Sequence, residues 1–285
     1  MSKEGLNSEN IGDGVHQFYK EKVVLCEWGK ILEDKSRWER YNLEKIGDEW
    51  KKIVEDEEWQ GILGHDANNL DHMRMCFSLT RIFVDSQNET YPENGFSERE
   101  RLVLRVTAAV HDLAEAKTGD NSFDLKTEED EKEEMDIMSP ILDEVLKDSD
   151  FGIEKEEIIE VLRNKESKLG RAFNIIESIG YFRTGIIAWR KSNKIDNRKV
   201  TEHLKFLASN VLGNQIKKLS GLVEECALAE YFINFYRDDI SEAFEKIPMD
   251  IFDNYKDEED GEKAAEDNEK KFKEAKEIWK EFTSK

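Results

Sequence analysis

The chain has 285 residues, of which 38% are hydrophobic, and it carries a formal net charge of −22. So large an acidic excess argues against a long nucleic-acid duplex as a partner, because duplex binding requires Lys and Arg to neutralise phosphates. No apolar run approaches the ~20 residues of a membrane span, and the polar segment 1–13 has no signal-peptide core, so we expect no membrane segment. The three cysteines show no CxxC spacing and fit a reducing compartment, which predicts a cytoplasmic protein.

Apolar residues recur at spacings of three and four along almost the whole chain, which predicts an all-α fold. The predicted helices, in chain order, are 15–33, 36–57, 68–86, 97–116, 128–147, 154–165, 171–192, 200–212, 214–237 and 262–282. The expected organisation is an N-terminal helical extension (1–60), a central domain (61–252), and an acidic linker followed by an amphipathic C-terminal helix (253–285).

The most informative segment is HDLAEAKTGD, residues 111–120. His111 and Asp112 are adjacent, so both can reach one metal ion from a helix end. Glu115 follows them by about one turn and is expected on the same side of the helix. The glycine after it is a typical helix stop, which would place Asp120 in the turn beyond. Because ionisable groups at the end of an apolar helix are costly to bury without a cation or hydrogen bonds, this segment predicts a functional site.

A second histidine motif precedes it. The segment DHMRM, residues 71–75, opens another apolar helix and contains His72. The order His, then His-Asp, resembles the HD-domain phosphohydrolases, whose pattern is H…HD…D, and most of all their 5′-deoxynucleotidase-like branch. The first motif of that branch, (E/D)-H-x-x-R-(M/V), is similar to residues 71–75, although one residue rather than two separates His72 from Arg74. Its second motif, H-D-x-x-E-x-x-x-G-D, matches residues 111–120 without a gap. The resemblance covers residues 60–190 and implies that the central region is an HD phosphohydrolase domain.

The resemblance implies a single divalent metal ion held by His72, His111 and Asp112. The family supplies a final Asp from a later helix, but the equivalent helix here has none, and Glu177 takes its position. Asp196 is the second candidate for this ligand; a surface role for Glu177, or a degenerate site without a fourth ligand, stays open. Two imidazoles and two carboxylates suit Mn²⁺, Co²⁺, Fe²⁺, Ni²⁺ or Zn²⁺, and cysteine is expected to play no part.

A bound metal would lower the pKa of a water molecule and neutralise phosphate charge. Glu115 and Asp120 are the expected catalytic residues, which move protons for the attacking water and the leaving alkoxide. Arg74, inside the first motif, and Lys117 are the expected substrate-binding cations. Further cation candidates are Lys126, Arg183 and Arg190. These assignments predict metal-dependent hydrolysis of a small anionic phosphomonoester, with nucleoside 5′-monophosphates as candidates.

Two other classes of function stay open. The first is a catalytically weak HD module that binds metal and nucleotide as a sensor or docking protein. The second is a di-iron oxygenase, which needs additional histidines, whereas His65 is the only other one near the motifs. Deoxynucleotidases of this type also carry an Arg-Trp element before the first His, and the stretch 59–65 does not align with it.

The C-terminal helix carries an apolar stripe at helical spacing. Its members are Phe272, Ala275, Ile278, Trp279 and Phe282. Because the polar face lacks a basic excess, the stripe is expected to pack on the protein's own body, or on a second subunit in a homo-oligomer, rather than on a membrane.

Overall fold

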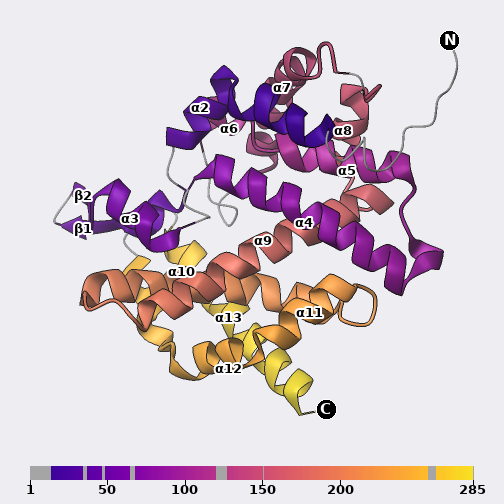
Figure 1. The fold of residues 1–285 in the computed structure, drawn as a ribbon. Helices are drawn as coiled ribbons and strands as arrows, with labels where there is room; N and C mark the ends of the chain where they lie inside the picture. The colour runs from indigo at the N-terminus through magenta and orange to yellow at the C-terminus, as the bar shows by residue number, and fades with distance from the viewer. Residues whose placement is uncertain are drawn as a thin grey trace, which may run out of the picture. The chain divides into compact units, whose positions relative to one another are not determined.

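The computed structural model describes residues 14–34, 37–46, 49–64, 68–119, 127–149, 151–255 and 261–284. These residues are almost all helical, which confirms the predicted all-α class (Figure 1). They form two compact units. Unit 1 comprises the described residues of 1–35, 68–121 and 126–176, and unit 2 those of 36–67 and 177–285. No helix in the described ranges has the length and apolarity needed to cross a bilayer.

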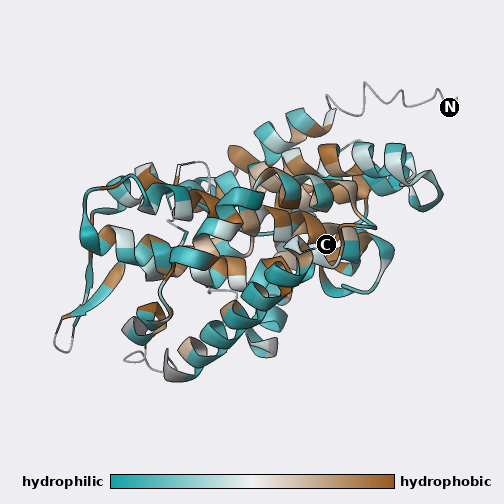
Figure 2. Cartoon of the chain, turned by 90° about the horizontal axis from the view of Figure 1, so that it is seen from below, coloured by the Kyte–Doolittle hydropathy of each residue, from teal (hydrophilic) through white to brown (hydrophobic). Residues whose placement is uncertain are grey.

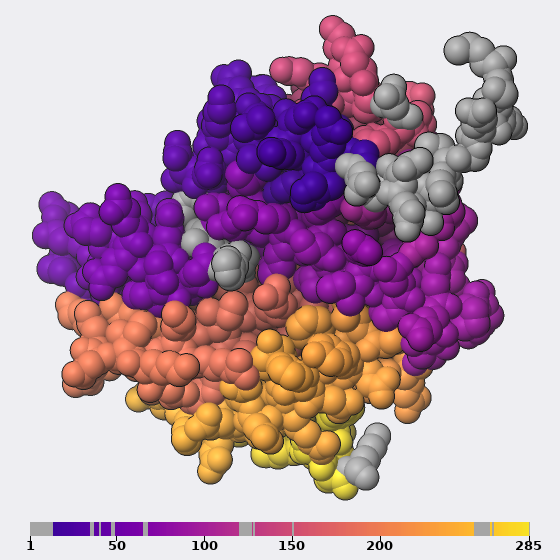
Figure 3. Space-filling model, in the orientation of Figure 1, coloured from indigo at the N-terminus to yellow at the C-terminus, as the bar shows by residue number. Residues whose placement is uncertain are grey.

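Unit 1 carries both histidine motifs. Its elements are the π-helix η1 (Tyr19–Val24), α2 (Glu27–Asp34), α4 (Asn69–Thr90), the 3-10 helix η3 (Pro92–Asn94), α5 (Glu98–Val110), α6 (Glu115–Thr118), α7 (Glu128–Val145), α8 (Lys155–Arg163) and the start of α9 (Lys168–Ser192). On the face shown in Figure 3, the indigo atoms of α2 adjoin the purple atoms of α4, which α2 contacts. The structure divides the predicted helix 15–33 into η1 and α2. Cys26, which lies between them, caps α2 by accepting a hydrogen bond from Gly29 N at 3.3 Å.

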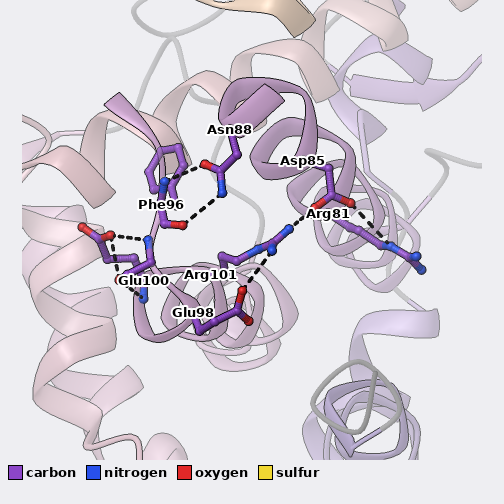
Figure 4. A network of polar contacts seen from close by, with 8 residues as sticks. Arg81, Asp85, Asn88, Phe96, Glu98, Glu100 and Arg101 are labelled. Atoms are coloured by element: carbon purple, nitrogen blue, oxygen red, sulfur yellow. Dashed lines mark hydrogen bonds and ion pairs between the residues drawn. The ribbon is translucent and has the colours of Figure 1, made fainter. Parts of the chain in front are cut away.

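Helices α4 and α5 run antiparallel, and polar contacts fix the end where the chain turns (Figure 4). Asn88 of α4 pairs with the backbone of Phe96, donating to its carbonyl at 3.0 Å and accepting from its N–H at 2.6 Å. Arg101 of α5 bridges Asp85 of α4 and Glu98. Since this end is fixed, the start of α4 is brought next to the end of α5, where the two histidine motifs lie.

Unit 2 contains the 3-10 helix η2 (Glu39–Asn42), β1 (Leu43–Ile46), β2 (Glu49–Lys52), α3 (Asp56–Leu63), the remainder of α9, α10 (Arg198–Ser220), α11 (Ala227–Phe235), α12 (Arg237–Lys246), the 3-10 helix η4 (Met249–Tyr255) and α13 (Gly261–Thr283). The prediction of one helix over 36–57 is wrong, because β1 and β2 form an antiparallel hairpin that pairs Leu43 with Lys52. The buried Asn42 closes its base, since its side chain donates to Val54 O at 2.9 Å and accepts from Val54 N at 3.2 Å.

Helix α10 also differs from its prediction. A break was predicted at Gly213, but α10 continues to Ser220, and the separate helices α11 and α12 follow. Gly213 is where α13 approaches most closely: a Cβ there would lie 3.0 Å from the Cα of Phe272. Helix α13, from Gly261 to Thr283, agrees with the helix predicted over 262–282. Figure 2 shows hydrophilic residues along α13, while Phe272 and Trp279 of its apolar stripe are buried within unit 2.

Candidate metal centre

The two histidines of the motifs meet in the interior of unit 1. His72 lies in the first turn of α4, which Asn68 caps by accepting from Asp71 N at 2.8 Å. His111 ends α5, whose start carries a capping box formed by Ser97 and Glu100. The ring centroids of His72 and His111 are 5.4 Å apart, and the exposed fractions of the two residues are 0% and 4%. Two helices whose starts the sequence predicts to within one residue therefore place both imidazoles side by side.

The hydrogen bonding of His111 shows which of its nitrogens is available as a ligand. Nδ1 lies 3.1 Å from the carbonyl oxygen of Ala108. A carbonyl only accepts, so Nδ1 carries the proton in the neutral ring and Nε2 carries the lone pair. A bond of this kind, to a backbone carbonyl, is what orients metal-ligating histidines in proteins. The buried Nε2 makes no hydrogen bond to any residue that the structure describes.

Asp112 completes a half-shell of donors. Its Oδ1 lies 3.3 Å from His111 Nε2, and the residue is buried. A lone pair and a carboxylate oxygen this close repel each other unless a cation lies between them. In a tetrahedral zinc site, Zn–N of about 2.0–2.1 Å and Zn–O of about 2.0–2.2 Å put N and O ligand atoms roughly 3.4 Å apart. The observed separation therefore fits two ligands of one metal ion.

Cys76, which the sequence analysis left out of the site, lies one turn after His72 on α4. Its Sγ is 3.5 Å from His72 Nε2, and donor atoms of His72, Cys76 and His111 all lie within 4.8 Å of one another. The signal in the sequence was the spacing itself, since residues four apart share one side of a helix.

Glu115 reaches this region by a different route from the one predicted. The predicted helix 97–116 ends at Val110, a turn follows, and Glu115 opens the short helix α6. Its buried carboxylate accepts a hydrogen bond from the side chain of Asn69, which the sequence analysis did not identify. The predicted helix stop is confirmed: Gly119 has φ +85° and donates to Glu115 O at 2.9 Å. Asp120 lies outside the described residues.

The expected substrate cations lie at the surface. Arg74 follows His72 by two residues, so it does not share its side of α4. It forms an ion pair with Asp71 at 2.5 Å and leaves 60% of its side chain exposed. Burial raises the pKa of the neighbouring Tyr19 hydroxyl, and the positive charge of Arg74 opposes this shift. Lys117 lies 4.5 Å from the ring centroid of Trp28 in α2.

Four of the remaining candidates belong to unit 2. Glu177 is half-buried and Asp196 is exposed; both belong to unit 2, so their role as a fourth ligand stays a prediction. Arg183 is half-buried in α9, while Arg190 forms a bidentate ion pair with Asp239 at 2.7 and 2.8 Å. Two further predicted residues lie outside the described ranges: Lys126 and His65.

An aromatic ring covers one side of the histidine pair. Phe173, from the part of α9 that belongs to unit 1, lies 5.1 Å from His111 between ring centroids, at 71°. Its edge-on packing fixes the imidazole plane and excludes water from that side.

Unit 2 holds an Arg-Trp pair that the sequence analysis missed. Arg37 is 3% exposed, and its guanidinium lies 5.0 Å from the ring of Trp38 and 5.4 Å from the ring of Tyr181. The signal was the dipeptide itself. It precedes His72 in the chain, but it lies upstream of the stretch 59–65, with which the Arg-Trp element was compared.

Comparison of the chain with protein-family models, with curated proteins and with solved structures finds no match.

Proposed function

We propose that the protein is a metal-dependent phosphohydrolase of the HD type that acts on a phosphomonoester, with nucleoside 5′-monophosphates as the first candidates. The observation that carries the proposal is the buried pair His72 and His111, with the carboxylate of Asp112 at 3.3 Å from His111 Nε2. This set comes from the two motifs that resemble the family, and it comprises donors that suit a divalent transition metal.

A divalent ion held there would act as a Lewis acid and lower the pKa of a bound water. The chain's own residues would then handle protons and orientation. Water attacks phosphorus, the bond to the ester oxygen breaks, and Glu115 accepts the proton of the attacking water. Asn69 donates to that carboxylate and so holds it in place. Asp120 is the proposed donor to the leaving alkoxide.

Substrate recognition is proposed for two basic residues of unit 1. Arg74 and Lys117 are the cations nearest in sequence to the metal ligands. The guanidinium of Arg74 can bind a substrate phosphate if its ion pair with Asp71 breaks.

One observation favours a second candidate, the catalytically weak module that binds metal and nucleotide. His72 and Cys76 are both 0% exposed, and closed shells are typical of structural rather than catalytic metal sites. For either candidate we propose the reducing cytosol as the compartment, since Cys26, Cys76 and Cys226 are all free thiols.

The test uses the full chain, stripped of metal and reloaded separately with Mn²⁺, Co²⁺, Fe²⁺, Ni²⁺ or Zn²⁺. Elemental analysis gives metal per chain, and phosphate release is measured on nucleoside 5′-monophosphates and p-nitrophenyl phosphate. We expect one ion per chain and metal-dependent phosphate release. One ion without release from any ester would favour the binding module, and no bound ion in any preparation would refute both.

A further inference from the structure

We propose that Cys76 is a thiolate ligand of the metal ion bound by His72 and His111. The inference rests on the metal centre of the proposed function and identifies its fourth protein donor. It gives the centre two imidazoles, one carboxylate and one thiolate in place of the two imidazoles and two carboxylates expected from the motifs.

The first argument is distance. Zn–S of about 2.3 Å and Zn–N of about 2.0–2.1 Å put the S and N ligand atoms of a tetrahedral site roughly 3.6 Å apart. Cys76 Sγ lies 3.5 Å from His72 Nε2. His111 Nε2 and Asp112 Oδ1, at 3.3 Å, form a second pair with a suitable separation, and His111 joins His72 and Cys76 in one cluster of donor atoms within 4.8 Å, to which Asp112 does not belong.

The second argument is the buried lone pair of His111. Its Nε2 makes no hydrogen bond to any described residue and has the carboxylate of Asp112 at 3.3 Å, and a ring nitrogen of His111 lies within 4.8 Å of Cys76 Sγ. Because leaving a buried polar atom without a partner costs about 1–3 kcal/mol, a cation shared with the neighbouring donors explains the arrangement.

The third argument is charge. The thiolate of Cys76 and the carboxylate of Asp112 together balance one divalent cation. A neutral centre is much less costly to bury than a charged one, and both residues are less than 9% exposed. A thiolate donor also favours Zn²⁺, Co²⁺ or Fe²⁺ over Mn²⁺. Glu177 is then not required as the fourth ligand.

The other two cysteines have a different explanation. Cys26 caps α2 by accepting from Gly29 N at 3.3 Å, and Cys226 caps α11 by accepting from Ala229 N at 3.4 Å. Burial raises the pKa of both thiols. Cys76, in contrast, lies within α4 and directs its sulfur at an imidazole nitrogen. Cys26 and Cys226 therefore serve as matched controls.

The experiment is the electronic absorption spectrum of the full chain loaded with one equivalent of Co²⁺, since a Co–S bond gives an intense near-ultraviolet charge-transfer band. A thiol that only donates a hydrogen bond to His72 gives none. We expect the band in the natural protein and in the Cys26→Ser and Cys226→Ser variants. Cys76→Ser should lose the band and bind Co²⁺ at least about tenfold more weakly.

Bound Co²⁺ without the band in the natural protein would overturn the inference, whether or not Cys76→Ser folds. Failure to bind Co²⁺ at all would overturn it together with the proposed metal centre. Phosphate release without the band would leave the proposed function standing and remove the thiolate, whereas the band without phosphate release would do the reverse.

Discussion

The stability that a metal ion adds to unit 1 gives the sharpest test of the donor set. A ligand that binds only the folded state at 100 times its Kd stabilises that state by about 2.7 kcal/mol. The perturbation is His111→Phe. The substitution keeps an aromatic ring at position 111, where the imidazole centroid lies 5.4 Å from that of His72 and 5.1 Å from that of Phe173, but it removes both ring nitrogens. We expect the variant to lose almost all of the 2.7 kcal/mol.

A smaller cost appears without metal. His111→Phe also removes the hydrogen bond from Nδ1 to Ala108 O, which is worth about 1 kcal/mol. The matched control is His203→Phe in unit 2, because His203 Nδ1 makes the same 3.1 Å contact with Tyr41 O. The control should show a similar cost in metal-free protein while retaining the full gain on metal addition.

The assay is amide hydrogen exchange of peptides from α4 and α5, and from α10 for the cost of the control. It is measured with chelator and, for every variant, with Zn²⁺ at 100 times the Kd that calorimetry gives for the natural protein. Exchange reports the local free energy of opening, so it separates unit 1 from unit 2. An equal metal-dependent gain in His111→Phe and the natural protein would show that His111 is not a ligand.

Three further outcomes are expected. Glu115→Gln should keep its metal in elemental analysis but lower the rate of phosphate release about 10²–10⁴-fold, as loss of a general base does; turnover at the natural rate would remove that role. Gly213→Ala should destabilise the protein by up to about 2 kcal/mol in urea titration. Its Cβ would lie 3.0 Å from the backbone of Phe272, and overpacking of ~1–3 kcal/mol exceeds the ~1 kcal/mol gained in helix propensity. Burial lowers the pKa of His203, so the folded state binds fewer protons than the unfolded chain, and stability present above pH ~6.5 is lost as the pH falls below it. In His203→Phe the stability between pH 7 and 5 should fall less than in the natural protein.

The sequence predicts most of the helices because their apolar residues recur with the helical period. It fails over 36–57, where charged residues alternate with few apolar ones and the hairpin depends on the contacts of Asn42 with Val54. It also fails at Gly213, since a glycine reads as a helix stop unless the approach of Phe272 is known. Local pattern cannot show which helix will later pack on a position.

The residues of the candidate site also fall into those that the sequence predicts and those that it does not. The motifs themselves point to His72, His111 and Asp112. The structure brings the two histidines together and places Asp112 beside His111, while the cluster of donor atoms within 4.8 Å consists of His72, Cys76 and His111. Asn69 was missed because nothing in its own neighbourhood shows that it meets Glu115, which follows it by 46 residues and lies on another element. Cys76 was missed for a different reason. A thiolate metal site is usually recognised from pairs of cysteines at CxxC spacing, and Cys76 is a single cysteine one turn after a histidine.

The discontinuous construction of unit 1 affects when a metal can be captured during synthesis. His72 and Cys76 are made early, but Phe173, which covers His111, follows His72 by roughly one hundred residues. At about 5–20 residues per second, the first two donors exist for roughly 5–20 s before the ring that shields the site is made. Loading is therefore expected to be a late event in the life of the nascent chain, after the first part of α9 has emerged and docked.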